Sequence, residues 1–198
     1  MNGRSDEPPM NLSKALYFGD FLASPITIIV LAAVALAGRD IETAGLWVLA
    51  LLAGVGAWTL VEYAVHRWVY HRVAFFEKFH DAHHADPRAL IGAPSFFSVG
   101  VVLGVFFVPL LAVGLVTASG FASGALLGYI GYMMVHHVSH HVEPRPGSLL
   151  YRARIRHMAH HYHGTPGNYG VTTPFWDRVF STSLERRRRR PPVDAASV

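Results

Sequence analysis

Long apolar stretches alternate with short polar segments along this chain. The stretches carry one charged residue, Glu62, near the end of the second. A helix needs about 20 residues to cross a bilayer core of roughly 30 Å, so the second and third stretches are long enough, whereas the first and fourth need flanking turns. The pattern predicts an all-α membrane protein with four transmembrane helices, at residues 21–38, 44–65, 96–118 and 121–135.

A short polar connection joins the first stretch to the second, and another joins the third to the fourth. Arg39, Asp40 and Glu42 follow the first stretch, and residues 117–124, rich in Ser and Gly, lie between the third and fourth. Such residues are typical of turns, so we expect two helical hairpins. The alternative is a soluble protein with buried helices, but uncharged blocks of this length rarely occur four times in one small soluble domain.

Basic residues are distributed unevenly about these hairpins. With both hairpin loops on one side of the membrane, 16 of the 17 Lys and Arg residues fall on the other, and Arg39 is the exception. Positively charged segments stay in the cytoplasm. We therefore expect a multi-pass protein, in a bacterial inner membrane, with both termini and the active site in the cytoplasm.

Length and composition limit the remaining possibilities. A chain of 198 residues accommodates one domain, and we divide it into a polar N-terminal segment at 1–20, a membrane domain at 21–182, and a basic tail at 183–198 that we expect to be disordered. The net charge of +4 includes five arginines at 186–190. A basic tail on a membrane protein faces anionic lipid, so no nucleic-acid partner is expected.

Histidine is the residue type that suggests chemistry. The chain has 13 histidines and no cysteine, so any metal must be bound through nitrogen or oxygen. All the histidines lie in the segments that follow the two predicted hairpins. The pattern His-x-x-His-His occurs twice, at residues 80–84 and 157–161, and positions i, i+3 and i+4 share one face of a helix. Each triplet is therefore expected to present three imidazoles in one direction.

Two spaced pairs accompany the triplets. His136 and His140 are one helical turn apart, whereas His66 and His71 are about 140° apart on an ideal helix, so that helix is predicted to end or bend between them. Imidazole suits iron, zinc, copper and nickel. Ten histidines could furnish two metals with about five ligands each: His66, His71, His80, His83, His84, His136, His140, His157, His160 and His161. His137, His141 and His163 lack a repeated spacing and are expected to be bystanders.

These motifs resemble the membrane-bound fatty acid hydroxylase and sterol desaturase superfamily. The resemblance runs from about Glu62 to Thr182 and includes the two triplets and two pairs in the family's order. Residues 170–180, Gly-Val-Thr-Thr-Pro-Phe-Trp-Asp-Arg-Val-Phe, also resemble the family's C-terminal signature. Among its branches, the catalytic domain of fatty acid 2-hydroxylases is the most similar.

The resemblance implies a cytosolic, histidine-rich helical cap that holds a non-haem dimetal site, with the ten histidines as ligands. By this resemblance, two iron ions would use dioxygen to hydroxylate a membrane lipid, and the first expectation for the hydroxylated part is a fatty acyl chain. Zinc can replace iron in recombinant protein, because similar nitrogen sites bind zinc well. Eukaryotic 2-hydroxylases often carry a fused cytochrome b domain, and this chain has no room for one. We therefore expect a separate electron donor, either a ferredoxin, a cytochrome or a reductase.

Several further roles follow as hypotheses. Metal-bound histidines usually donate their second ring N–H to a carboxylate or carbonyl, and Glu62, Asp81 and Asp177 are the candidate carboxylates. The side chains expected to line an acyl channel, if they are not simply lipid-facing, are Trp58, Tyr63, Phe96, Phe97, Tyr132 and Met133. The alternative functions are a sterol or carotenoid hydroxylase or desaturase, and a non-catalytic metal-binding membrane protein.

Overall fold

A computed structural model describes residues 12–184, which form an all-α fold. The predicted tail at 183–198 lies almost wholly outside the described residues, as does much of the segment at 1–20. The domain boundaries therefore stay predictions. In chain order the helices are α1 (Lys14–Phe18), α2 (Asp20–Leu36), α3 (Ile41–Ala64), η1 (Val65–Tyr70), α4 (Ala74–Ala85), α5 (Ser95–Val102), η2 (Leu103–Phe107), α6 (Val108–Leu110), α7 (Leu115–His141), α8 (Leu149–Tyr162) and α9 (Phe175–Val179).

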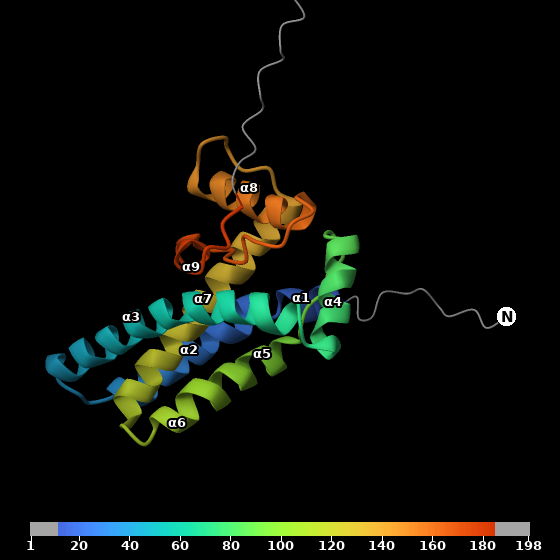
Figure 1. The fold of residues 1–198 in the computed structure, drawn as a ribbon. Helices are drawn as coiled ribbons and strands as arrows, with labels where there is room; N and C mark the ends of the chain where they lie inside the picture. Colours follow the sequence, from blue (N-terminus) through green and yellow to red (C-terminus); the bar gives the residue numbers. More distant parts are fainter. Residues whose placement is uncertain (1–11, 185–198) are drawn as a thin grey trace, which may run out of the picture.

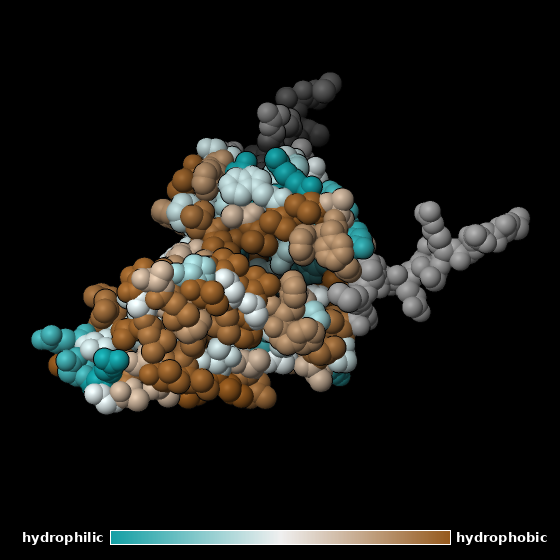
Figure 2. Space-filling model, turned by 90° about the horizontal axis from the view of Figure 1, so that it is seen from below, coloured by the Kyte–Doolittle hydropathy of each residue, from teal (hydrophilic) through white to brown (hydrophobic). Residues whose placement is uncertain are grey.

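Three continuous helical segments are long and apolar enough to cross a membrane: Lys14–Leu36, Ile41–Tyr70 and Leu115–His141. A fourth apolar segment, Ser95–Leu110, is shorter. Apolar side chains such as Leu22, Ile29 and Val34 are more than half exposed, which suits lipid and not water. Figure 2 shows the molecule from below, with apolar side chains over much of the bundle and hydrophilic ones gathered at one end. The chain is a membrane protein with three clear candidate spans.

The first hairpin turns where the sequence predicts. Helix α2 ends at Leu36 and α3 begins at Ile41. The side chain of Asp40 caps α3 by accepting the N–H of Thr43 at 2.9 Å, and this satisfies one of the unpaired donors at the helix start. Glu42, predicted to lie in the connection, belongs to the first turn of α3.

The predicted loop at residues 117–124 is wrong. These residues lie inside α7, and the turn comes earlier, between Leu110 and Leu115, where Gly114 has a φ of +139°. A side chain at Gly120 or Gly124 would overlap the backbone of α3, so the small residues let two helices approach closely, as in other membrane proteins. Ser119 bridges three helices, since it accepts from Trp47 Nε1 at 3.0 Å and donates to the Leu31 carbonyl at 2.7 Å.

Helix α7 is the centre of the bundle and contacts α2, α3 and α8. In Figure 1, α8 and α9 lie together above the bundle, and α4 stands at one end of it. The long helix that starts at Ile41 widens into π-helical turns at η1 and ends at Tyr70, directly before His71. This confirms that the helix ends between His66 and His71. The wider turns belong to a helix type that often occurs at functional sites.

Candidate metal centre

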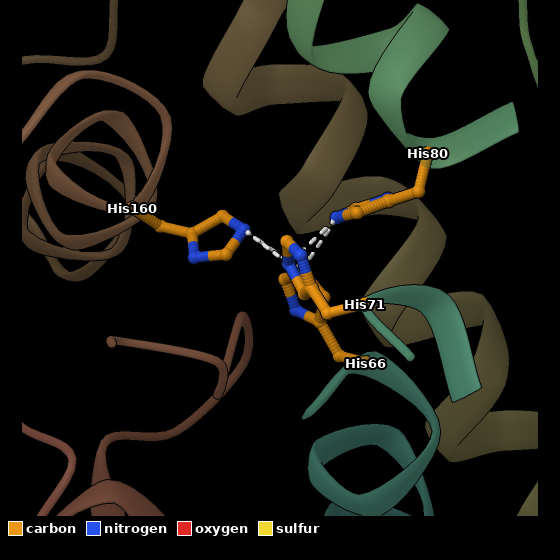
Figure 3. A group of neighbouring side chains, drawn as sticks. All are labelled: His66, His71, His80 and His160. Carbon is orange, nitrogen blue, oxygen red and sulfur yellow. Dashed lines mark hydrogen bonds between the residues drawn. The ribbon is translucent and has the colours of Figure 1, made fainter. Parts of the chain in front are cut away.

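Histidines from four separate parts of the chain converge in two adjacent groups. The first histidine group consists of His66, His71, His80 and His160, and the second of His83, His136, His140 and His157. Within each group, one ring nitrogen from every member lies within 4.8 Å of the others. Figure 3 shows the first group, with rings from η1, the following turn, α4 and α8 pointing toward one another.

Two further histidines extend these groups to five members each. His84 Nε2 lies 3.1 Å from Nε2 of both His80 and His160, beside the first group. His161 Nε2 lies 3.2 Å from His157 Nε2, beside the second. The His84 and His161 rings stack with centroids 4.1 Å apart, where the two groups meet. The ten histidines brought together are the ten that the sequence pattern singles out.

The triplets do not each point in one direction, as predicted, but divide between the groups. His80 and His84 belong to the first group while His83 faces the second. On α8 the division is reversed, since His160 lies in the first group while His157 and His161 lie at the second. On a helix, i+4 is displaced about 40° to one side of i and i+3 about 60° to the other. Each triplet therefore spans both groups.

Burial favours the neutral form of the converging histidines on α4 and α8. It lowers the pKa of His83 and His84 to about 4 and that of His160 to about 3, and neighbouring histidines add to the effect. Burial also lowers the pKa of His71, while the charge of Asp81 opposes that shift. These rings are therefore neutral at pH 7, which is the form of imidazole that binds metal ions.

The first group contains a contact that protein atoms alone do not explain. His66 Nδ1 lies 2.7 Å from the Tyr169 carbonyl, and His160 Nδ1 lies 2.9 Å from the Gly167 carbonyl. A carbonyl only accepts, so each neutral ring has its proton on Nδ1 and a bare lone pair on Nε2. Yet the two Nε2 atoms lie 3.0 Å apart. A second proton on either ring would create a charge inside a buried cluster, which is costly.

The two Nε2 lone pairs repel each other at this distance, and a metal ion bound between them would remove the repulsion. Nitrogen ligands lie about 2.1 Å from a metal such as zinc, so two neighbouring ligands at a right angle are separated by about 3 Å. Four of the six Nε2–Nε2 separations within the first group, those between neighbouring rings, are 3.0–3.2 Å. In the second group the His83–His136 and His140–His157 separations are 3.0 and 2.8 Å. The nitrogen sets therefore have dimensions that fit metal ions.

A loop at residues 167–172 supports the first group from outside, and two buried carboxylates fix it. Glu62 accepts the N–H groups of Val171 and Thr172 at 2.6 and 2.8 Å. Asp177 accepts those of Tyr169 and Gly170, each at 2.9 Å.

Glu62 and Asp177, two of the three carboxylates proposed as histidine partners, thus contact the loop. Two carbonyls of this loop face His66 and His160. Asp81 is exposed on α4, and its charge acts on His71 and His84. The carbonyls of Gly167 and Tyr169 could not be predicted from the sequence, because a backbone carbonyl has no residue signature.

The three expected bystanders lie outside both groups. His137 and His141 stack on each other with centroids 4.3 Å apart, and His137 Nδ1 lies 3.3 Å from the Tyr17 hydroxyl. His163 is exposed at the end of α8. They are available as controls for the ten converging histidines.

An apolar cavity of about 380 Å³ adjoins the histidines. Its wall includes His66, His80, His83 and His136, four phenylalanines of α4 and α5, and the polar side chains of Ser98 and Tyr129. Among the residues proposed for an acyl channel, Phe97, Tyr132 and Met133 line this cavity. Trp58 lines a smaller neighbouring one, Phe96 is 76% exposed, and Tyr63 is fully buried. The cavity is suited to an apolar chain held beside the histidines.

Known proteins are similar to this chain in fold and in sequence. A solved structure of full-length scs7p, in which only the hydroxylase domain is visible, superimposes with a TM-score of 0.71 at 27% identity, and covers 85% of this chain and 67% of that one. The ceramide very long chain fatty acid hydroxylase scs7 of Schizosaccharomyces pombe is 34% identical over 144 residues, which are 66% of this chain and 41% of that protein.

Mammalian and plant proteins are also similar. The fatty acid 2-hydroxylase of Rattus norvegicus is 34% identical over 152 residues, which are 71% of this chain and 40% of that protein. The dihydroceramide fatty acyl 2-hydroxylase FAH2 of Arabidopsis thaliana is 31% identical over 140 residues, which are 65% of this chain and 58% of that protein. The chain thus spans about two fifths of the length of the yeast and rat relatives. The fatty acid hydroxylase family model matches residues 51–182, and the chain belongs to this family.

Proposed function

We propose that this protein is a membrane-bound non-haem di-iron oxygenase that hydroxylates the fatty acyl chain of a lipid. The observation that carries the proposal is the 3.0 Å contact between the bare Nε2 atoms of His66 and His160, inside a group of five imidazoles beside an apolar cavity. Family membership supports the reaction class. The relatives are hydroxylases of fatty acids, ceramides or dihydroceramides by name, and this supports an acyl substrate.

Two metal ions, each with five histidines, account for all ten converging rings. Bound iron would supply the redox chemistry that activates dioxygen and oxidises an unactivated C–H bond, for which side chains have no equivalent. The reaction places one oxygen atom in the C–H bond and releases the other as water, with a pair of electrons and a pair of protons consumed. We propose that the electrons come from a separate ferredoxin, cytochrome or reductase.

The protein's own residues orient the metal-binding rings and shield the cavity from water. The carbonyls of Gly167 and Tyr169 set the ring orientation of His160 and His66, so their Nε2 atoms face inward. The phenylalanines of α4 and Met133 form an apolar wall that holds an acyl chain next to His83 and His136. Exclusion of water from this cavity protects reactive species from side reactions.

The meeting of the histidines supports four membrane crossings. The cytoplasmic end of the α3 segment carries His66, and the end of α7 carries His136 and His140, and these ends come together. This meeting supports an even number of membrane crossings between Tyr70 and His141. Helix α7 is one crossing, and Ser95–Leu110 is the other apolar helix in that interval. Its 16 residues extend about 24 Å, so the adjoining turn must complete the span.

Lipid mass spectrometry of expressing cells grown under isotopically labelled dioxygen tests the function. The proposal predicts one labelled oxygen atom in an acyl chain, and labelled sterol or carotenoid would replace the acyl substrate with another lipid. Elemental analysis of unchelated, detergent-purified protein tests the metals, with two transition-metal ions per chain expected and zinc acceptable in place of iron. One ion or none would contradict the dimetal centre, and two ions without any labelled product would favour a metal-binding protein.

A further inference from the structure

The two histidine groups differ in what their outward-facing ring nitrogens contact. In the first group, His66 Nδ1 and His160 Nδ1 each face a backbone carbonyl at hydrogen-bond distance. For His157 of the second group and for His161 beside it, the Nδ1 atom is buried and has no hydrogen-bond partner within residues 12–184. Because both groups draw rings from α8, the difference comes from the loop at 167–172, which reaches only the first group.

The Tyr169 carbonyl, which accepts from His66, is itself held in place. Asp177 binds the N–H groups on either side of the Tyr169 carbonyl, and the Thr182 hydroxyl lies 2.7 Å from the same carboxylate. Such charge-assisted hydrogen bonds are roughly twice as strong as neutral ones. The proton of His66 and that of His160 are therefore fixed on Nδ1 before any metal binds, and the Nε2 lone pairs already face the site.

The second group has a competing metal-free arrangement. His140 Nε2 and His157 Nε2 lie 2.8 Å apart, and with no acceptor at His157 Nδ1 the ring proton is free to occupy Nε2 and bind His140. Metal binding through both Nε2 atoms breaks that hydrogen bond and moves the proton to Nδ1. A buried donor without a partner is unfavourable. Metal binding at the second group therefore carries a free-energy cost that the preorganised first group does not have.

We infer that the two groups bind their metal ions with unequal affinity, the first tightly and the second as an exchangeable ion. The inference rests on the proposed dimetal centre and ranks its two ions by affinity. Loss of outer hydrogen-bond partners lowers the metal affinity of a histidine site by about 10- to 100-fold, and the difference between the groups is expected in this range. Chelation should therefore produce a one-metal protein, occupied at the first group, before the metal-free form.

Two variants isolate the groups for measurement. His140→Ala disrupts the second group and leaves the first complete, while His71→Ala does the reverse. Each is loaded with zinc in detergent and titrated with a competing chelator, and the zinc retained per chain is measured by elemental analysis. The His140→Ala protein should hold its ion at least about tenfold more tightly. Equal affinities, or tighter binding by His71→Ala, would overturn the inference.

The cause of the difference is tested by adding Asp177→Asn to both variants. It should weaken zinc binding about tenfold or more in the His140→Ala background and leave the His71→Ala background unchanged, which makes the second background the matched control. Thermal unfolding of each metal-free protein shows whether the fold persists, and Glu62→Gln replaces Asp177→Asn if it does not. Equal weakening in both backgrounds, or in neither, would contradict the role of the loop. A wild-type protein with fewer than two ions would contradict the proposed function itself, whereas two ions of equal affinity would contradict only this inference.

Discussion

Glu62 and Thr172 are 110 positions apart in sequence, yet Thr172 donates both its backbone N–H, at 2.8 Å, and its hydroxyl, at 2.6 Å, to the Glu62 carboxylate. Glu62 lies one helical turn before His66, so this contact joins the helix that carries the first histidine to the C-terminal loop that orients it. A membrane-border carboxylate that looks anomalous in the sequence thereby has a structural role.

Removal of this carboxylate should destabilise the protein. Glu62→Ala leaves the buried N–H of Val171 and the partly buried N–H of Thr172 without their acceptor, and an unsatisfied buried group costs about 1–3 kcal/mol. We expect a clear fall in the thermal unfolding temperature of the metal-loaded protein in detergent. Glu143→Ala, which changes an exposed carboxylate, is the control. Equal unfolding temperatures for the two variants would show that the Glu62 contacts do not hold the loop.

The close approach of α3 and α7 gives a second prediction. Gly124→Ala should destabilise the bundle, because the added methyl group would overlap the Leu51 carbonyl and force the helices apart. Gly131→Ala, on the same helix, meets open space and should be neutral or slightly stabilising, since alanine is favoured over glycine in a helix by about 1 kcal/mol. Thermal unfolding of both variants measures the difference, and a tolerated Gly124→Ala would refute the close packing.

The glycines of α7 show which part of the fold could not be predicted from the sequence. Ser and Gly at 117–124 predict a turn in a soluble protein and close helix contact in a membrane protein, and composition does not separate the two. The convergence of the ten histidines was predictable, because repeated spacing on helices is visible in the sequence. Their division into two groups was not, since it depends on how α4 and α8 face each other. The carbonyls of Gly167 and Tyr169 were equally hidden.

The cavity predicts a paired effect on substrate use. Met133 lines the cavity, whereas its neighbour Met134 is 48% exposed on the outer surface. Met133→Trp fills space that an acyl chain needs and should lower kcat/KM for long acyl chains by about tenfold or more, since even one methylene in such a pocket is worth 10- to 200-fold. Met134→Trp should have little effect. The assay is hydroxylated product formed from acyl chains of graded length, and equal effects of both variants would place the substrate elsewhere.

Membrane topology is open to direct labelling, because the chain has no native cysteine. Arg39→Cys and Ala112→Cys occupy the turns between α2 and α3 and between α6 and α7, which the proposed topology places on the outer side of the membrane. Thr165→Cys is at an exposed position between α8 and the loop at 167–172. In intact cells an impermeant thiol reagent should label the first two and label Thr165→Cys only after lysis. Labelling of Thr165→Cys in intact cells, or protection of Ala112→Cys, would rule out four crossings with a cytoplasmic metal centre.

The most direct test of the central claim measures labelled oxygen in product lipid from the purified, iron-loaded enzyme supplied with reductant and labelled dioxygen. Wild-type protein and His163→Ala should both place one labelled atom in the acyl chain, because His163 lies outside the histidine groups. His84→Ala and His161→Ala remove a ring from the first and the second group, respectively, and each should abolish the product while the fold, checked by thermal unfolding, persists. Full activity and two bound metals in His84→Ala or His161→Ala would contradict the account, as would the absence of labelled lipid from a wild-type protein that carries two iron ions.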